Sequence, residues 1–468
     1  MMSISNIVVR RGCRKACSSA LMRQRLSRAT AIIAPPNHHP DLTMCRRQLT
    51  NSPPSIVVDR SLSPRQAAAL EESILKELQQ SLQDTILKTD IRTLGWLKNV
   101  TINNKVVKVV LRLPTLLHPH LKELESDIQR IVSQKVPPGF TVQVDTSATQ
   151  PIPFVRNIQE HTELISNLGP GLSNVSHFLA VYSCKGGVGK STVAVNLAYE
   201  LARMGGRVGL LDVDIYGPSL PILVHPDHPE VHQSSLGPGM VKPITHQGVK
   251  LMSLGYVSPN SGVPGSGPDG GAAVMRGPMA GRVVTQLLKG TDWGDLDVLV
   301  LDMPPGTGDV HLAICQELQL SGAVSVTTPS KLAATDARKG IEMFTSLGVH
   351  TLAAVENMAY FECDGGGKHY PFGEGIKKLA EDEEFSKTDI FQLPISTHTN
   401  QANDGGTPLC LARPTEASME LSVFEMLAKK VAHELLLLQH GRASSKEAPG
   451  SKVSMSIGGN VSEHFDIG

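Results

Sequence analysis

One stretch of the chain, residues 180–192, has the residue types and spacing of a phosphate-binding loop. It reads Ala-Val-Tyr-Ser-Cys-Lys-Gly-Gly-Val-Gly-Lys-Ser-Thr. Glycines let backbone N–H groups approach phosphate oxygens without an intervening Cβ. We predict that Lys190 neutralises the β- and γ-phosphates of a nucleotide and that the Ser191 hydroxyl holds Mg²⁺. The other loop residues expected to bind the nucleotide are Gly186, Gly187, Val188, Gly189 and Thr192.

Two acidic motifs follow the loop, each at the end of an apolar run. They are Leu-Asp-Val-Asp at 211–214 and Val-Leu-Val-Leu-Asp at 298–302. Carboxylates at the carboxyl ends of parallel strands face the ligand crevice of the sheet. We expect Asp214 to orient the attacking water, Asp212 to support the Mg²⁺ shell and Asp302 to sense Mg²⁺. The Pro-Pro-Gly loop that follows, 304–309, can change conformation when the γ-phosphate is lost.

The elements around these motifs alternate between strand and helix. An apolar run enters the phosphate-binding loop and a helical pattern, 193–201, leaves it, which is the context that such a loop requires. Further strand-like runs lie near 207–213, 250–256, 297–302, 322–327 and 350–356. The alternation predicts an α/β fold, a doubly wound and mostly parallel sheet with helices on both faces. The proline- and glycine-rich residues 258–272 are expected to form a surface insertion. A final helix is expected over Thr415–Leu438, with Gly441 as its C-cap.

A smaller α+β domain is predicted before the sheet. Ser63-Pro64-Arg65-Gln66 has the signature of a capped helix start, and Leu70, Ile74, Leu78 and Leu82 follow on one face. A turn at 103–104, a strand over 107–113, a second helix through Leu121, Leu124, Ile128 and Ile131, and a strand over 140–144 complete an α-β-β-α-β order. The expected divisions are a leader at 1–57, the small domain at 58–147, a linker at 148–175, the nucleotide domain at 176–441 and a disordered tail at 442–468.

Charge is distributed unevenly, although the 468-residue chain carries 44 basic and 44 acidic side chains. Residues 1–58 hold nine basic side chains and one acidic, a pattern typical of an organellar transit peptide, with the mitochondrion favoured over the plastid and a cytosolic tail less favoured. The remainder is acidic, which argues against nucleic-acid binding. No apolar run has the length of a membrane span. Four scattered cysteines outside the leader do not form a disulfide framework.

The phosphate-binding loop departs from the usual pattern in a specific way. Cys184 stands where the first glycine is expected, and Lys185 precedes the glycines. The loop thus resembles the deviant loop of the MinD/ParA/nitrogenase-iron-protein class. That resemblance adds Cys184 and Lys185 to the nucleotide-binding residues. It also implies a homodimer in which Lys185 reaches the nucleotide of the partner subunit and contributes to catalysis with Lys190, Asp214 and Asp302.

A run of motifs over about residues 175–412 resembles the Mrp/ApbC family of iron–sulfur carrier ATPases, and within it the plant chloroplast-type members. These motifs are the loop, 211–219, Met275–Met279, Asp302–Asp309, Thr328–Pro329 and Glu356–Met358. The resemblance implies a P-loop ATPase that binds a [4Fe–4S] cluster at its dimer interface, accepts it from upstream donors and passes it to apo-proteins. It also places Asn357 against the adenine of ATP.

The cluster ligands are less regular than the family pattern. Members of the family carry Cys-x-x-Cys shortly after Glu-Asn-Met, whereas here Cys363 remains and Gly366 replaces the second cysteine. A symmetric dimer supplies cysteines in pairs, so Cys363 needs a second contributor from each subunit. We favour Cys315 for this role, with Cys184 as the alternative. Cys410 has no assigned place, and His225, His228 and His232 are more typical of a loop than of a metal site.

Two other readings of the sequence remain open. A positioning ATPase of the MinD/ParA kind would use the same loop as a switch, but its membrane helix or basic surface is not evident in this sequence. A scaffold that has lost cluster binding is consistent with the missing cysteine. The small domain resembles the PaaD-like domain of iron–sulfur assembly factors, but Leu117-His118-Pro119 stands where that domain has a cysteine before its proline, which favours a docking module.

Overall fold

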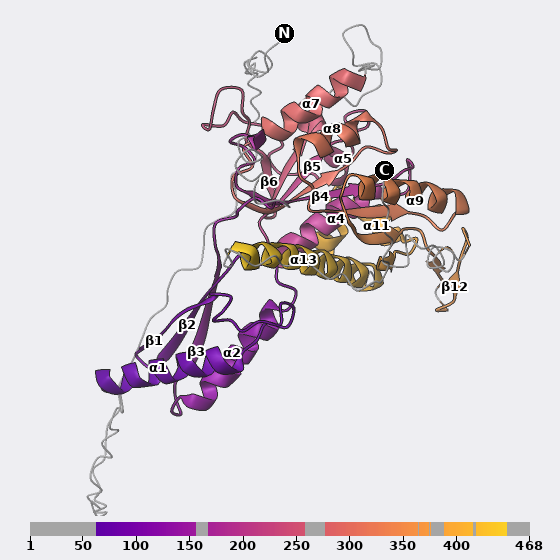
Figure 1. Cartoon of the computed structure of the whole chain (residues 1–468). Helices are drawn as coiled ribbons and strands as arrows, with labels where there is room; N and C mark the ends of the chain where they lie inside the picture. Colours follow the sequence, from indigo (N-terminus) through magenta and orange to yellow (C-terminus); the bar gives the residue numbers. More distant parts are fainter. Residues whose placement is uncertain are drawn as a thin grey trace, which may run out of the picture. The chain divides into compact units, whose positions relative to one another are not determined.

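The computed structural model describes residues 62–155, 167–257, 277–363, 365–373, 375, 388–414 and 418–446 (Figure 1). Several predictions therefore lie outside the described residues. They concern the leader, the insertion at 258–272, the motif residues Met275 and Arg276, and the tail beyond Lys446. Within the described part of the chain, none of the helices is both long and apolar enough to cross a membrane.

The first described block has the predicted α-β-β-α-β order. Its three-stranded sheet has the order β1-β2-β3, with β1 antiparallel to β2 and β2 parallel to β3. Ile74 and Leu78 of the first helix and Leu124, Ile128 and Val132 of the second are buried against it. The elements are α1 (Pro64–Ser81), β1 (Leu97–Asn103), β2 (Val106–Leu113), α2 (Leu121–Lys135) and β3 (Thr141–Ala148).

Local sequence explains where these elements start and turn. The Ser63 hydroxyl accepts a hydrogen bond from the Gln66 backbone N–H, and the Gln66 side chain accepts one from the Ser63 N–H, which is the predicted capping box. Asn104 and Lys105 both have positive φ, 45° and 63°, between β1 and β2. Two left-handed residues are what a tight hairpin turn requires, so the turn lies one residue later than expected.

The second block is an eight-stranded sheet of order β13-β10-β9-β4-β8-β5-β7-β6. Every neighbouring pair is parallel except β6 and β7. The doubly wound, mostly parallel α/β fold is thus confirmed. Its strands are β4 (Val175–Tyr182), β5 (Val208–Asp212), β6 (Ile244–His246), β7 (Val249–Ser253), β8 (Leu296–Asp302), β9 (Gly322–Thr327), β10 (Thr351–Glu356) and β13 (Ile390–Gln392).

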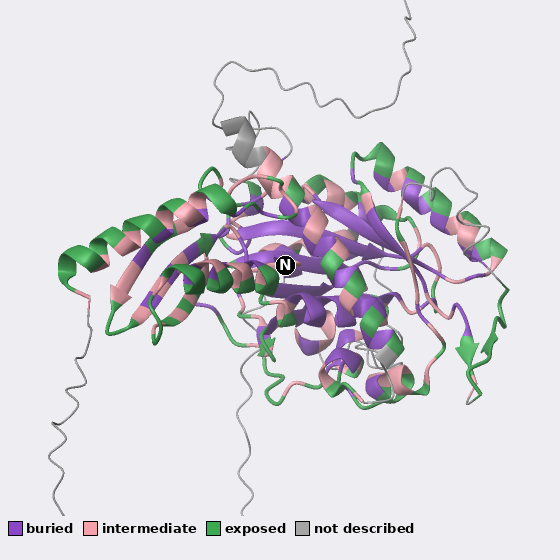
Figure 2. Cartoon of the chain, turned by 90° about the horizontal axis from the view of Figure 1, so that it is seen from below, coloured by how far each residue is buried: buried purple, intermediate pink, exposed green. Residues whose placement is uncertain are grey.

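Helices cover both faces of this sheet. Alternate residues of β4 enter different cores: Leu179 and Val181 pack with α4 and α13, whereas Phe178 and Ala180 pack with α7 and α8. Figure 2 shows the central strands buried between helices whose outer faces are exposed. The helices are α4 (Lys190–Arg203), α5 (Leu220–Leu223), α6 (Leu254–Val257), α7 (Gly277–Lys289), α8 (Asp309–Glu317), α9 (Lys331–Ser346), α11 (Thr397–Asp404), α12 (Leu409–Ala412) and α13 (Ser418–Lys446).

The final helix extends beyond its predicted C-terminal end, whereas its predicted first residue, Thr415, lies outside the described residues. We expected it over Thr415–Leu438 with Gly441 as its C-cap, but α13 runs from Ser418 to Lys446 and contains Gly441. One glycine in a helix costs only about 1 kcal/mol, and the alanine, arginine and lysine around it favour the helix. The nucleotide domain therefore continues into the segment assigned to the tail. Its predicted apolar face is buried, from Phe424 through Leu427 and Val431 to Leu435.

The segment expected to be a linker is partly packed. Leu168 and Leu172 are fully buried in the core of the eight-stranded sheet, and the Phe154 N–H donates to the Ser176 carbonyl, 2.7 Å away. Four short strands were not predicted: β6, β13, and the two strands of a hairpin, β11 (Phe361–Glu362) and β12 (Lys368–His369). Two- and three-residue strands are too short to show a period-two pattern.

Candidate functional site

The phosphate-binding loop joins buried strand β4 to helix α4. Gly187 and Gly189 have φ of 75° and 84°, a conformation that glycine adopts without strain, and Gly189 is the N-cap of α4. A Cβ on Gly189 would lie 2.1 Å from the Asn357 side-chain nitrogen. Glycine is thus required at 189 both by backbone conformation and by the close approach of a neighbour. The first N–H groups of a helix have no acceptor within it, and such a helix start favours the binding of an anion.

Lys190 lies at the centre of the site and is 7% exposed. Its Nζ donates to Asp302 Oδ1 and lies 3.2 Å from Ser191 Oγ. Ser191 also hydrogen-bonds to Asp302. The predicted phosphate ligand and the two predicted Mg²⁺-associated oxygens are therefore brought together at the carboxyl ends of β4 and β8, which are neighbouring strands.

The two strand-end carboxylates, Asp212 and Asp302, face each other in register on β5 and β8. Burial, and then the charge of Asp302, raise the pKa of Asp212 to about 7. Burial also raises the pKa of Asp302, against the stabilising charge of Lys190. Two buried carboxylates at one point lack enough positive charge in the protein alone, which is the electrostatic setting that a divalent cation satisfies.

Asp212, predicted to support the Mg²⁺ shell, and Asp214, predicted to orient the attacking water, have different surroundings. Asp212 is 1% exposed and accepts the N–H groups of Asp214, Ser219 and Leu220 and the Ser253 hydroxyl, at 3.0–3.1 Å. Asp214 is half-buried, and its carboxylate accepts a hydrogen bond from the Gly217 N–H, 3.2 Å away. Asp212 thus fixes the loop after β5, and the carboxylate of Asp214 is the one presented by that loop.

Asn357 contacts the phosphate-binding loop directly. Its Nδ2 donates to the Val188 carbonyl, 2.9 Å away, and its Oδ1 accepts the Met358 N–H. Met358 has φ of 56°, so the backbone turns sharply after Asn357. This places Asn357 beside the loop, as its predicted role in nucleotide binding requires, and leaves the adenine contact itself a prediction.

Lys185 is held within its own subunit. Its Nζ lies 3.4 Å from Asp336 Oδ2 on α9, and both side chains are about a quarter exposed, at 29% and 26%. Lys339 also approaches Asp336, with its Nζ 3.6 Å from Oδ1. If Lys185 contacts the nucleotide of a partner subunit as predicted, it must leave the Asp336 carboxylate and pair with a phosphate instead.

The Pro-Pro-Gly loop is tied to the phosphate-binding loop by one backbone hydrogen bond. The Gly306 N–H donates to the Ser183 carbonyl, 2.9 Å away, and α8 begins at Asp309 directly after this loop. His311 of α8 is 1% exposed, and its ring stands edge-on to Phe344. Burial, and then the charge of Lys190, lower the pKa of His311 to about 4. A neutral imidazole is thus buried in the first turn of α8, directly after the Pro-Pro-Gly loop.

Two residues that the sequence analysis missed support the loop helix. The Asn403 Nδ2 donates to the Thr192 hydroxyl at 3.1 Å, and the Asn196 Oδ1 accepts the Cys410 N–H at the same distance. Both bonds connect α4 to the segment that contains α11 and α12, which lies more than 200 residues further along the chain. The sequence offered no indication of these contacts beyond the residue type, since asparagine is common in loops and helix caps.

The cysteines occupy different environments. Cys410 is buried, which gives a structural place to a residue that the sequence could not assign. Cys184 packs against α9, because a Cβ on Gly340 would lie 2.5 Å from its Sγ, and burial followed by the charge of Asp336 raises its pKa to about 11. Cys315 is on α8, packed against the core, whereas Cys363 is in the β11–β12 hairpin. Figure 1 shows α8 and β12 at separate parts of the molecule, so one subunit does not bring Cys315 to Cys363.

No group of three or more metal-ligating His, Cys, Asp or Glu side chains occurs in the described ranges. Of the histidines with metal-like spacing, His225 donates its N–H to the Gly406 carbonyl, and its ring leaves no room for a Cβ on Gly406. The loop reading of His225, His228 and His232 is therefore consistent with the structure.

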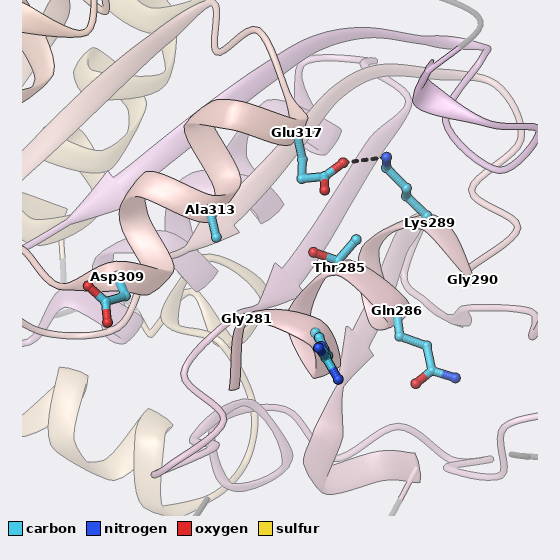
Figure 3. A pocket seen from close by; sticks show the side chains of 9 residues that line it. Gly281, Thr285, Gln286, Lys289, Gly290, Asp309, Ala313 and Glu317 are labelled. Carbon is cyan, nitrogen blue, oxygen red and sulfur yellow. Dashed lines mark ion pairs between the residues drawn. The ribbon is translucent and has the colours of Figure 1, made fainter. Parts of the chain in front are cut away.

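A groove of about 750 Å³ runs between α7 and α8, outside the nucleotide site (Figure 3). Lys289 and Glu317 face each other across it and form an ion pair. The two helices approach closely at Gly281 and Ala313, where a Cβ built on the glycine would lie 3.8 Å from the alanine methyl. The other residues that line the groove are Arg282, Thr285, Gln286, Gly290 and Asp309.

Together the parallel sheet, the left-handed loop glycines and the Lys190–Ser191–Asp302 cluster define a P-loop NTPase. The family model described as ParA, NUBPL iron-transfer P-loop NTPase, matches residues 174–432. The chain belongs to this family, in agreement with the Mrp/ApbC resemblance of its motifs.

Several known proteins are similar to the chain. The chloroplastic Fe-S cluster assembly factor HCF101 of Arabidopsis thaliana is 41% identical over 350 residues, which cover 74% of this chain and 61% of that protein. The iron-sulfur cluster carrier protein of Escherichia coli K12 is 37% identical over 361 residues, which cover 76% of this chain and 90% of that protein. A solved structure of a nucleotide-binding protein from Archaeoglobus fulgidus in complex with ADP is 34% identical. The match covers 52% of this chain and 91% of that chain, with a TM-score of 0.43. The chain thus spans about three fifths of the length of its chloroplastic relative.

Proposed function

We propose that this protein is an ATP-hydrolysing iron–sulfur cluster carrier, which receives a [4Fe–4S] cluster from upstream donors and passes it to apo-proteins. Membership of the iron-transfer P-loop NTPase family supports the cargo, and the cluster of Lys190, Ser191 and Asp302 supports the nucleotide. The E. coli relative, of which the chain covers 90%, is named an iron–sulfur cluster carrier protein. The single observation that carries the proposal is this match of family and loop geometry.

The nucleotide step follows from how the charges are arranged. Lys190 is paired with Asp302 in this structure, and an entering triphosphate would attract Lys190 toward its β- and γ-phosphates. That movement leaves the Asp302 carboxylate and the Ser191 hydroxyl, both hard oxygen donors, to hold Mg²⁺. When bound, Mg²⁺ would neutralise charge on the phosphates. Asp214, presented by the loop that Asp212 fixes, would orient the attacking water.

The second subunit enters through Lys185. In the proposed homodimer, Lys185 leaves Asp336 and contacts the nucleotide of the partner, so the active site is complete only across the interface. Lys185→Ala should then reduce ATP hydrolysis about as strongly as loss of an oxyanion-hole donor, roughly a hundredfold, without abolishing ATP binding. Full activity in Lys185→Ala would remove the sandwich-dimer part of the proposal.

The cargo is tested by anaerobic reconstitution of the full chain with iron and sulfide. We expect iron, sulfide and visible absorbance in the wild-type protein and their loss in Cys363→Ser, because a thiolate ligand is removed. Cys410→Ser is the matched control, since that thiol is buried and pairs with the Asn196 carbonyl, 3.5 Å away. No cluster in the wild type would favour the ATPase scaffold that has lost cluster binding. Equal cluster in Cys363→Ser would exclude Cys363 as a ligand.

The cellular address is part of the proposal. The basic leader supports import into an organelle: its arginine-rich composition favours the mitochondrion, while the relative named chloroplastic favours the plastid. Residues 1–60 fused to a fluorescent protein, expressed in cells that have both organelles, would separate the two. A diffuse cytosolic signal would show that the segment does not act as a targeting sequence.

A further inference from the structure

The β11–β12 hairpin places a histidine against the one cysteine that remains of the family pair. Phe361 pairs with His369 and Glu362 with Lys368, so the hairpin closes just beyond Cys363. The Cys363 N–H donates to the Gly367 carbonyl at 3.1 Å, and the Gly366 N–H donates to the Cys363 carbonyl at 2.8 Å. These bonds make a compact turn with the Cys363 thiol and the His369 ring on it.

The two side chains converge on one point in space. A Cβ built on Gly367 would lie 3.3 Å from Cys363 Sγ and 3.7 Å from His369 Nε2, so glycine leaves open a cradle that both atoms border. The His369 side chain hydrogen-bonds to the Cys363 sulfur, and the backbone N–H groups of Gly365 and Gly367 also donate to it. The turn thus holds the sulfur and the imidazole next to each other.

Gly366, where the family has its second cysteine, has a different character. Its φ is +75°, a conformation that side-chain-bearing residues adopt only with strain, and a Cβ there would have nothing within 4 Å. The turn therefore has room for a cysteine at 366 but is built for glycine. The second ligating position of the hairpin has to come from another residue, and His369 is the one beside the sulfur.

The surroundings of the cradle fit a second copy of the same hairpin. Phe361, Tyr370 and Phe372, which are near the pair in the chain, are 45%, 40% and 51% exposed, so this segment presents large aromatic side chains to solvent. One hairpin provides one thiolate and one imidazole, which is half of the four ligands that an iron–sulfur cluster takes. Two-fold symmetry doubles any ligand pair that lies at an interface.

We propose that His369 is the second cluster ligand of each subunit, so that the cargo is held across the dimer by two Cys363 sulfurs and two His369 Nε2 atoms. This inference rests on the proposed carrier function and replaces Cys315 in the ligand set. On binding, each Cys363 thiol releases its proton to solvent and each neutral imidazole ligates through Nε2, with no change in oxidation state. Two neutral ligands in place of two thiolates make the bound cluster less negative and raise its reduction potential.

The test is anaerobic reconstitution of the full chain, with iron and sulfide measured per dimer and pulsed EPR of the reduced cluster read for ¹⁴N coupling. In the wild type we expect a directly coupled nitrogen. His369→Ala should lower cluster content about tenfold or more, the scale of losses in metal-site variants. His369→Cys should restore the cluster, lose the nitrogen coupling and lower the reduction potential. His350→Ala, a change at an exposed histidine outside the hairpin, should behave as the wild type does.

A double variant sharpens the result. In Gly366→Cys/His369→Ala, a cysteine at the open position 366 should recover cluster content while the nitrogen coupling stays absent. Wild-type iron in His369→Ala, or a wild-type cluster without nitrogen coupling, would overturn the His369 assignment and leave the carrier function standing. Zinc in place of iron would overturn the assignment as a cluster ligand. A wild-type protein that takes up no cluster would overturn the carrier function itself, so the two failures are distinguishable.

Discussion

The nucleotide site and the Cys363 hairpin are assembled in opposite ways. Lys190 contacts Asp302, and Asn357 contacts the loop that carries Lys190, so residues that follow β4, β8 and β10 of one buried sheet meet in one site. Cys363 and His369 lie six residues apart on an exposed hairpin and need only a local turn. The first site is held by the core of the molecule, so its geometry is available in a single subunit. The second site presents half of the proposed ligand set, so its completion depends on the hairpin of a second subunit.

The difference also separates what each site can tolerate. A change in the nucleotide site disturbs a packed network in which a polar group without a partner costs about 1–3 kcal/mol. A change in the hairpin disturbs a few backbone bonds at the surface, where the surrounding water can replace lost partners. We therefore expect stability and nucleotide chemistry to respond to the first region, and cargo binding to the second.

The largest effect is expected for Lys190→Ala. Removing the ammonium leaves the phosphates without their nearest positive charge and Asp302 as a buried carboxylate without its partner, so ATP hydrolysis should fall about a hundredfold or more. Steady-state phosphate release would measure this. Lys331→Ala, at an exposed lysine of α9, is the control. Activity within a few-fold of the wild type would show that Lys190 does not contact the nucleotide.

Matched glycine variants test the contrast directly. Gly189→Ala places a methyl where the Asn357 amide now lies and strains a φ of 84°, so we expect a loss of about 2–3 kcal/mol in unfolding free energy and much weaker ATP binding. Gly366→Ala meets a similar φ, 75°, but open space, so about 1 kcal/mol of local strain should leave the melting temperature nearly unchanged. Equal losses in the two variants would contradict the contrast.

The sequence predicted the first region far better than the second. The long buried runs that became β4, β5, β8, β9 and β10 carry their own pattern, and the motif residues at their ends follow from the topology of a parallel sheet. The partners from distant segments, Asp336, Asn403 and His311, carry no local signal, because only the folded chain brings them to the loop. The hairpin was missed since its strands have two residues each, although Cys363 and His369 were both visible in the chain.

His311, in the helix that follows the Pro-Pro-Gly loop, should make the stability of the fold sensitive to acid. Its pKa of about 4 in the folded protein is below the ordinary value of 6.5, so its contribution to stability is fully present above pH 6.5 and is lost as the pH falls toward 4. The loss at pH 4 should be about 3 kcal/mol. Denaturant unfolding of His311→Gln at pH 7 and pH 4 should show a pH dependence smaller by this amount, and the exposed His350→Gln should not. An unchanged pH dependence in His311→Gln would contradict the assignment.

The smallest effect is expected for Asp336→Ala. It releases Lys185 from an ion pair whose side chains are about a quarter exposed and which is worth at most about 1 kcal/mol, so the subunit concentration that gives half-maximal ATPase activity should fall by up to about fivefold. Lys339→Ala removes a neighbour of the same carboxylate without freeing Lys185 and serves as the control. A higher concentration requirement in Asp336→Ala would mean that the pair prepares Lys185 for the partner.

The position of β4 at the middle of the sheet determines when its strand pairings can form during synthesis. This strand is hydrogen-bonded on one side to β8 and on the other to β9, which begin more than 100 residues after it ends. Such non-local parallel pairings form slowly, because long loops must close before any contact is gained. During synthesis, the phosphate-binding loop therefore has no stable strand behind it until the chain has been made past Thr327. Asn357, which closes over the loop, is made later still. A nascent chain stalled before that point is consequently a substrate for chaperones rather than for ATP.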